Sequence, residues 1–229
     1  MKGLDKGTSC EVCTCSCIAD IFMDDDMQLL DENKTEIAYN AGEIILKQGT
    51  YVSQLLFLKE GLVKIILEGK NDKNTILKIV DKGNFIALAV LGGQNIYPLT
   101  VISLTKTRIC QIKRECILEI MNRNGKANQY IIDWFSNDHL FLYSRLSVLS
   151  TRNNHGKLAS SLIYLKSKVN DNQIFSYITR KDLAELSSIS IESTNRILLE
   201  LKNDKIIQYD QGYIRILKPE LLQRLSEVG

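Results

Sequence analysis

The chain has 229 residues, 45% hydrophobic and 24% charged, with a formal net charge of +2. These values are ordinary for a globular protein of one or two domains, and the small charge means that any nucleic-acid surface must be local. The longest apolar run, residues 85–91, is far shorter than the roughly 20 residues of a membrane helix, and we find no secretory signal. We therefore expect a cytoplasmic protein with no membrane partner and with reduced thiols.

Residues 1–22 form a cysteine-rich segment. Its sequence CEVCTCSC contains Cys10, Cys13, Cys15 and Cys17. In a reducing compartment, clustered thiols favour metal or redox chemistry over a disulfide framework. Cys13, Cys15 and Cys17 would share one face of an extended chain. A turn would instead gather Cys10, Cys13 and Cys17.

Residues 23–121 are predicted to be a β-roll domain, with a short helix near residues 27–34 before its strands. Glycines separate short apolar runs that are rich in β-branched residues, a pattern typical of a β-sandwich or a barrel-like roll. These runs are GEIILKQG, SQLLFLKEG, LVKIILEG, TILKIVDKG, YPLTVISLT and RICQIK.

Residues 122–153 are predicted to be a dimerisation helix. Apolar residues recur there at steps of three and four, as in a heptad seam. The seam consists of Ile132, Phe135, His139, Leu142, Leu146 and Leu149. A second stripe beside it consists of Ile131, Trp134, Phe141 and Val148. Two stripes allow the helix to pack on its own domain and on a second copy of the chain. The alternative is an ordinary core helix in a monomer.

Residues 154–229 are predicted to form three helices and a hairpin. Thr179 and Asp182 are spaced as a capping box, and Ser190 is placed to cap a second helix after a tight connection at residues 187–189. That helix would bury Ile197, Leu198 and Leu201. Two short helices joined in this way are a helix-turn-helix, and the hairpin expected around residues 210–212 would be its wing.

The first turns of the second helix carry the side chains that would lie nearest to DNA bases. Arg196 can bind guanine through O6 and N7, and Glu192 can accept from cytosine N4. Their i,i+4 spacing would allow one to brace the other. The predicted DNA-binding set is Thr179, Arg180, Ser190, Ile191, Glu192, Ser193, Asn195 and Arg196. The alternative is a surface ion pair on an ordinary helical hairpin.

The order of β-roll, long helix and winged helix-turn-helix resembles the Crp/Fnr family of bacterial transcription regulators over residues 30–217. GEIILKQG and LLFLKEGLVKI match its glycine-spaced strands, and ITRKDLAELSSISIESTNRIL matches its DNA-binding motif. The resemblance implies an α+β fold with a cyclic-nucleotide-binding-like jelly roll, double-stranded DNA as ligand and RNA polymerase as partner. Ile191 stands where the cyclic-AMP branch has arginine, so the chain looks closer to the Fnr-type branch, which reads TTGA-like half-sites.

The resemblance to the Fnr-type branch also implies a 4Fe-4S cluster. Its expected ligands are Cys10, Cys13, Cys17 and Cys110, with Cys15 as a substitute. Cys110 in TRICQIK matches the family's internal ligand, but the crowded N-terminal spacing departs from the family's longer gap. The alternatives are zinc, a thiol/disulfide switch and a cysteine segment without a role. Cys116 is expected to be a small apolar residue of the next helix.

Cyclic AMP is not an expected ligand. Residues 83–104 correspond to the phosphate-binding stretch of the cyclic-nucleotide branch and contain no charged residue, so a buried phosphate would lack a cation. Haem ligation by His139 and an unknown small molecule in the roll are the alternatives for the signal. His139 would otherwise pair with its symmetry mate or with Asp138, and His155 is expected to be a polar surface residue.

Catalytic motifs such as G-x-S-x-G, a P-loop and H-E-x-x-H are missing from the sequence, so an enzyme is not expected. The sequence predicts a homodimeric regulator that binds palindromic DNA and responds to a redox, oxygen or nitric oxide signal at the cysteines. Two other classes stay open: a small-molecule module whose helix-turn-helix binds protein, and a redox or metal enzyme built on CEVCTCSC.

Overall fold

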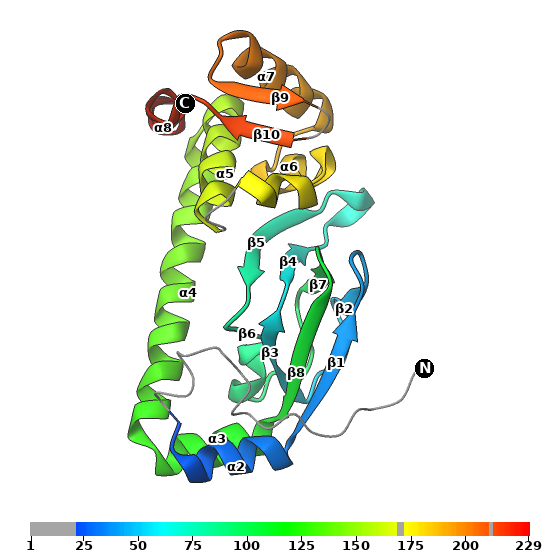
Figure 1. Cartoon of the computed structure of the whole chain (residues 1–229), viewed down its shortest axis with the longest axis vertical. Helices are drawn as coiled ribbons and strands as arrows, with labels where there is room; N and C mark the ends of the chain where they lie inside the picture. Colours follow the sequence, from blue (N-terminus) through cyan, green and yellow to red (C-terminus); the bar gives the residue numbers. More distant parts are fainter. Residues whose placement is uncertain (1–21, 169–171, 211–212) are drawn as a thin grey trace.

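The computed structural model of the chain describes residues 22–168, 172–210 and 213–229 (Figure 1). It is an α+β fold, as the sequence predicts. Its α-helices are α2 (Asp24–Glu32), α3 (Arg114–Arg123), α4 (Gly125–Thr151), α5 (Asn154–Lys168), α6 (Arg180–Ser187), α7 (Ile191–Asn203) and α8 (Pro219–Val228). Short 3-10 turns are η2 (Lys70–Asp72), η3 (Leu88–Gly92) and η4 (Asn172–Tyr177).

The strands of the N-terminal domain form two sheets, each four-stranded within the described residues. One sheet has the order β1-β8-β3-β6, from β1 (Lys34–Tyr39), β8 (Thr107–Lys113), β3 (Gln54–Glu60) and β6 (Asn84–Ile86). The other has the order β2-β7-β4-β5, from β2 (Ile44–Leu46), β7 (Thr100–Ser103), β4 (Leu62–Leu67) and β5 (Thr75–Asp81). The C-terminal hairpin pairs β9 (Ile207–Asp210) with β10 (Tyr213–Ile216).

One apolar core fills the roll and continues into the helices at its end. It is built by residues of both sheets, such as Leu56, Leu58, Val63 and Val101. Phe57 and Phe85 meet edge to face across β3 and β6, with ring centroids 5.2 Å apart. Burial of such side chains is the main favourable free-energy contribution to folding of the roll.

A second apolar core joins the other face of β4 and β5 to the C-terminal helices. Leu62, Ile66, Ile76 and Ile79 of these strands share it with buried residues of α5, α6 and α7 and with the hairpin. β4 and β5 are therefore buried on both faces. In Figure 1, α6 lies directly against the end of β5, and α4 runs along the side of the roll.

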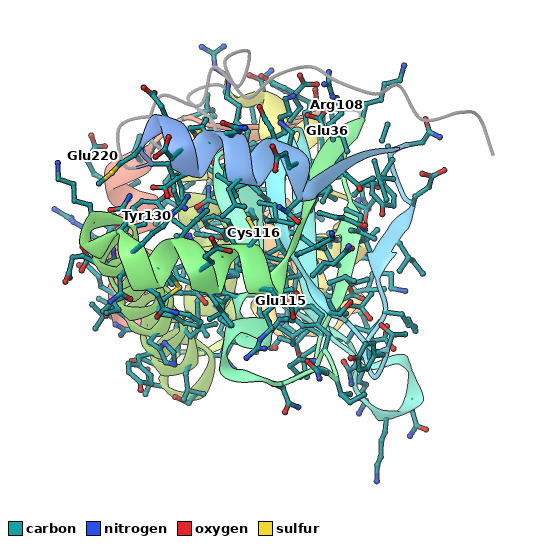
Figure 2. The ribbon with its side chains drawn as sticks, turned by 90° about the horizontal axis from the view of Figure 1, so that it is seen from below. Glu36, Arg108, Glu115, Cys116, Tyr130 and Glu220 are labelled. Carbon is teal, nitrogen blue, oxygen red and sulfur yellow. The ribbon has the colours of Figure 1, made fainter. Side chains whose placement is uncertain are left out.

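Buried polar contacts hold α2 against the α3–α4 junction. Asn124 caps α4 by accepting from the N–H groups of residues 126 and 127. Its amide also donates to Asp26 of α2 over 2.7 Å, and Arg123 donates to the same carboxylate over 2.9 Å. Figure 2 shows α2 and α3 side by side with Cys116 between them. Cys116 is buried and contacts the carbonyl of Leu29. The expectation that it is a small core residue is confirmed.

The observed elements agree with most of the predicted ones. Five of the six apolar runs contain β2, β3, β4, β5 and β7, and the sixth covers β8 except for its first residue. α4 lies inside the predicted range 122–153. β1 and β6, the two edge strands of their sheet, were not predicted. β1 mixes polar with apolar residues, and β6 has only three residues. α8 was also missed, although Pro219 at its start and Leu222 on its buried face are helix signals. The domain boundaries at residues 22, 121 and 153 stay predictions.

Within the described residues, every helix is too short or too polar to span a lipid bilayer.

The α2 junction generates a prediction about pH. Burial raises the pKa of Asp26, but the hydrogen bonds from Asn124, the Met23 N–H and Arg123 outweigh burial and hold the pKa below its usual value. A carboxylate with a lowered folded-state pKa stabilises above its unfolded pKa of about 3.9, and this stability is lost as pH falls through the folded pKa. Asp26→Asn should therefore lower the free energy of unfolding by about 1.5–3 kcal/mol at pH 7.

Denaturant unfolding of wild type and Asp26→Asn between pH 7 and pH 2 measures this effect. The gap between the two should close at the acid end. Asp24→Asn is the matched control, because Asp24 is exposed in the same helical turn. An equal loss in both variants, or a gap independent of pH, would contradict the assigned role of Asp26.

Candidate nucleic-acid interface

The first helix of the C-terminal motif begins with the predicted capping box. Thr179 is the N-cap of α6, and its hydroxyl accepts from the Asp182 N–H over 3.1 Å. The Asp182 carboxylate in turn accepts from the Thr179 N–H over 2.9 Å. Each end of the box satisfies a backbone donor that the first helical turn leaves without a partner.

The second helix is capped as predicted after a tight turn. Ser188 has φ of 49°, a left-handed conformation that ends α6. The Ser190 hydroxyl then accepts from the Ser193 N–H over 3.0 Å and starts α7. On its inner face α7 buries Thr194, Ile197, Leu198 and Leu201. These residues fix which side of α7 faces outward.

The predicted base-reading side chains lie on the outer face of α7. Ile191 is 48% exposed, Glu192 and Arg196 are exposed, and Ser193 and Asn195 are half-buried. α7, β9 and β10 lie at the end of the molecule opposite α2 and α3 (Figure 1). Because nothing in the chain covers this face within the described residues, it is available to a large ligand.

The expected bracing of Arg196 by Glu192 is wrong. Arg196 Nη1 instead lies 3.6 Å from a carboxylate oxygen of Glu200, one turn further along α7. The other oxygen of Glu200 lies 2.6 Å from Nε2 of His155 on α5. His155 was expected to be only a polar surface residue. Glu192 thus faces solvent, while Glu200 links α7 to α5.

A contact network that the sequence did not predict surrounds Asn195. Arg180 donates through Nη1 to Asn195 Oδ1 over 3.1 Å and through Nε to the Tyr209 hydroxyl over 2.8 Å. Its guanidinium also lies 5.1 Å from the centroid of the Tyr209 ring. The network joins α6, α7 and the wing strand β9.

Cations from outside the C-terminal domain contact both ends of α6. Lys64 of β4 lies 2.5 Å from the Asp182 carboxylate at the start of the helix, and both side chains are largely buried. Arg145 of α4 donates to the Leu186 carbonyl at the end of the helix. Cations at helix C-termini are favourable, because the last carbonyls carry partial negative charge. The orientation of the helix-turn-helix is thus coupled to the roll and to α4.

The two predicted stripes of α4 have different surroundings. In the inner stripe Ile131 is buried, Trp134 lies against the ammonium of Lys78, and Phe141 packs on Tyr164 of α5. Outside this stripe four large side chains are exposed. They are Ile132 (48%), Leu140 (64%), Tyr143 (63%) and Leu146 (65%).

Two polar residues of α4, His139 and Asp138, have partners within the chain. His139 Nδ1 lies 2.8 Å from the Phe135 carbonyl. Asp138 pairs with Lys78 of β5, so the expected pairing of His139 with Asp138 is wrong. Burial lowers the pKa of Lys78, against the opposing effect of its hydrogen bond to Asp138. This pair fixes α4 against the roll.

Among the expected cluster ligands, Cys110 lies in the part of the chain that the structure describes. Cys110 is buried in β8, directly opposite Glu36 of β1 and Phe57 of β3. Figure 2 shows Glu36 and Arg108 side by side on these strands, where they form an ion pair of 2.9 Å. Cys10, Cys13, Cys15 and Cys17 lie outside the described residues. Within the described residues no three His, Cys, Asp or Glu side chains are grouped to hold a metal.

The uncharged stretch 83–104 contains β6, η3 and β7. Arg114 of α3 donates to the carbonyls of Val90 over 2.8 Å and of Leu91 over 3.2 Å. This guanidinium therefore binds the protein backbone.

Comparisons with known proteins agree with this architecture. Residues 36–124 match the cyclic nucleotide-binding domain, and residues 156–225 match the Crp-like helix-turn-helix domain. The chain is 23% identical over 212 residues to the anaerobic regulatory protein of Bacillus subtilis. The aligned region covers 90% of this chain and 89% of that protein. The chain is 22% identical over 232 residues to the fumarate and nitrate reduction regulatory protein of Vibrio cholerae, covering 96% and 91%.

A solved structure has the same fold. FixK2 from Bradyrhizobium japonicum superposes with a TM-score of 0.75 at 14% identity, covering 84% of this chain and 96% of that chain. The roll, the long helix and the exposed helix-turn-helix define a DNA-binding transcription regulator rather than an enzyme. The chain belongs to the Crp/Fnr family.

Proposed function

We propose that this regulator binds a palindromic, TTGA-like DNA site as a homodimer and responds to a redox, oxygen or nitric oxide signal at residues 1–22. The observation that carries the proposal is the outward face of α7, where a capped helix exposes Ile191, Glu192 and Arg196 beside the half-buried Asn195. In this reading Arg196 binds a guanine, Glu192 accepts from a cytosine and Ile191 touches a thymine methyl. Thr179 and Ser193 contact phosphates and set the register, and Arg180 and Ser190 complete the DNA-binding set beside them.

The exposed side of α4 supports the homodimer. Large apolar side chains that stay in water on one helix face are typical of an interface. Leu146 and Ile132 both belong to the predicted heptad seam and are about half exposed or more. A symmetric pairing along α4 would place two copies of α7 about 34–36 Å apart, one turn of DNA. The signal would bias the balance between two such arrangements.

Two observations support a signal at the cysteines. The relatives from Bacillus subtilis and Vibrio cholerae are named for anaerobic regulation and for fumarate and nitrate reduction. Cys110 lies on β8, inside the roll to which α2 connects residues 1–22. Thiolates suit an iron–sulfur cluster, and a bound 4Fe-4S cluster would supply oxygen-sensitive iron chemistry. Cys10, Cys13 and Cys17, with Cys15 as substitute, would complete the ligand set with Cys110.

The second candidate is a regulator of the same fold that senses a small molecule or haem. A cavity of about 300 Å³ between β5, α4 and α5 favours it. Lys78, Trp134, Asp138 and Tyr164 line this cavity with charged and aromatic groups. Cyclic AMP in its usual mode is still not expected, because residues 83–104 offer its phosphate no cation. RNA polymerase is the protein partner that the family resemblance implies.

Arg196→Ala tests the base-reading role. Loss of one bidentate contact should cost about 1–3 kcal/mol of binding free energy and relax specificity at one guanine. Site selection from random DNA, followed by titration of the full chain with substituted sites, measures both effects. Arg224→Ala removes the same charge from the exposed side of α8 and is the matched control. An equal loss of affinity for all DNA sequences would instead show that Arg196 contacts a phosphate.

Leu146→Glu tests the dimer. Two leucines per dimer, each contributing about 1.5–3 kcal/mol, would be replaced by facing carboxylates. The dimer dissociation constant should rise by more than about 100-fold. Sedimentation velocity measures it, with Tyr51→Glu as control, since Tyr51 is 68% exposed on the roll. A wild-type chain that is monomeric at micromolar concentration rules the dimer out.

Iron and acid-labile sulfide content, with a visible spectrum of protein purified without oxygen, tests the cluster. We expect about four irons and four sulfides per chain, lost in air. Cys110→Ala should abolish them. Cys116→Ala should not, because burial raises the pKa of Cys116 to about 11 and keeps it a thiol. An iron-free wild type that still binds palindromic DNA would reject the cluster and keep the regulator.

A further inference from the structure

The amide of Asn195 is held in one orientation by a residue of the preceding helix. Arg180, the first residue of α6, donates from Nη1 to Asn195 Oδ1 over 3.1 Å. A guanidinium has only hydrogen-bond donors. The Asn195 atom that faces it must therefore be the carbonyl oxygen, and the amide nitrogen must point away from Arg180. The chemistry of the pair alone decides which way the amide is turned.

Arg180 is itself fixed by the wing. Its Nε donates to the Tyr209 hydroxyl over 2.8 Å, and its guanidinium lies 5.1 Å from the ring centroid. A guanidinium that both stacks on a ring and bonds a hydroxyl has fewer orientations than one in solvent. Both protein partners of Arg180 in this network are neutral, so its positive charge is not cancelled by a carboxylate there.

This arrangement limits what Asn195 can read. An unrestrained asparagine binds adenine through both amide atoms, accepting from N6 and donating to N7. Here one lone pair of Oδ1 is already used by Arg180. The amide nitrogen keeps both of its donors and Oδ1 keeps only one lone pair, so the balance shifts from adenine toward base acceptors such as guanine O6 and N7 or thymine O4.

We propose that Arg180 and Tyr209 are positioning residues that set the base preference at the step read by Asn195. They act by turning its amide nitrogen toward the major groove. This inference rests on the proposed role of α7 in base reading. It differs from that role by assigning part of the specificity to a wing tyrosine that itself contacts no base.

Tyr209→Phe is the central variant, because it keeps the aromatic ring and removes the hydroxyl. The full chain is titrated with its selected palindromic site and with sites substituted at each position in turn. Asn195→Ala first identifies the base pair that Asn195 reads, because this variant should lose the preference among the four base pairs at that position of the site. At that position Tyr209→Phe should change the ratio of affinities among the four base pairs by about two- to tenfold, the range expected for one hydrogen bond.

Other readouts separate positioning from folding and from phosphate binding. Preferences at the other positions and the salt dependence of binding should stay as in wild type. Tyr209→Phe should have no further effect in an Asn195→Ala background, since the two changes act through one contact. Tyr213→Phe is the matched control, because Tyr213 is an exposed tyrosine of the neighbouring strand β10.

Three outcomes overturn the inference. The first is a base preference that is unchanged in both Tyr209→Phe and Arg180→Lys. The second is a uniform loss of affinity over all sites with a smaller salt dependence, which would make Arg180 a plain phosphate contact. The third is an Asn195→Ala variant that keeps the wild-type base preference at every position of the site. A wild-type chain without any base preference would overturn the proposed function as well.

Discussion

The double burial of β4 and β5 is the constraint on which the rest of the structure depends. One face of these strands closes the core of the roll, and the other closes the core of the DNA-binding helices through Leu62, Ile66, Ile76 and Ile79. Because apolar surface on both faces is removed from water, the C-terminal domain cannot leave the roll without exposing a core. The two domains are thus coupled by the hydrophobic effect and not only by the α4 connection.

Polar contacts give this apolar interface a defined geometry. Lys64 meets the capping-box carboxylate of Asp182, and Arg145 meets the carbonyl of Leu186, so the roll and α4 contact opposite ends of α6. The α4 helix is fixed to β5 by Lys78 and Asp138. Removing one partner of a buried pair is costly. A signal that shifts α4 would therefore change the contacts of α6 and, through it, the position of α7.

Local sequence signals predicted most of the elements and much of the candidate site. Thr179, Asp182 and Ser190 mark helix starts because side-chain caps depend on residues three positions apart. The glycine-spaced runs mark the strands. β1 and β6 were missed because β1 lacks a clear apolar pattern and β6 has only three residues, and because their pairing with β8 and β3 joins segments far apart in the chain.

The sequence by itself determined the fold class, the family resemblance and the exposed set of α7, because these depend on periodicity and on short motifs. Only the tertiary structure decided which charged groups meet. Arg196 pairs with Glu200 and not with Glu192, and Asp138 pairs with Lys78. Arg180 links Asn195 to Tyr209. Long polar side chains reach many neighbours, and their choice among them depends on how helices and strands from different parts of the chain pack together.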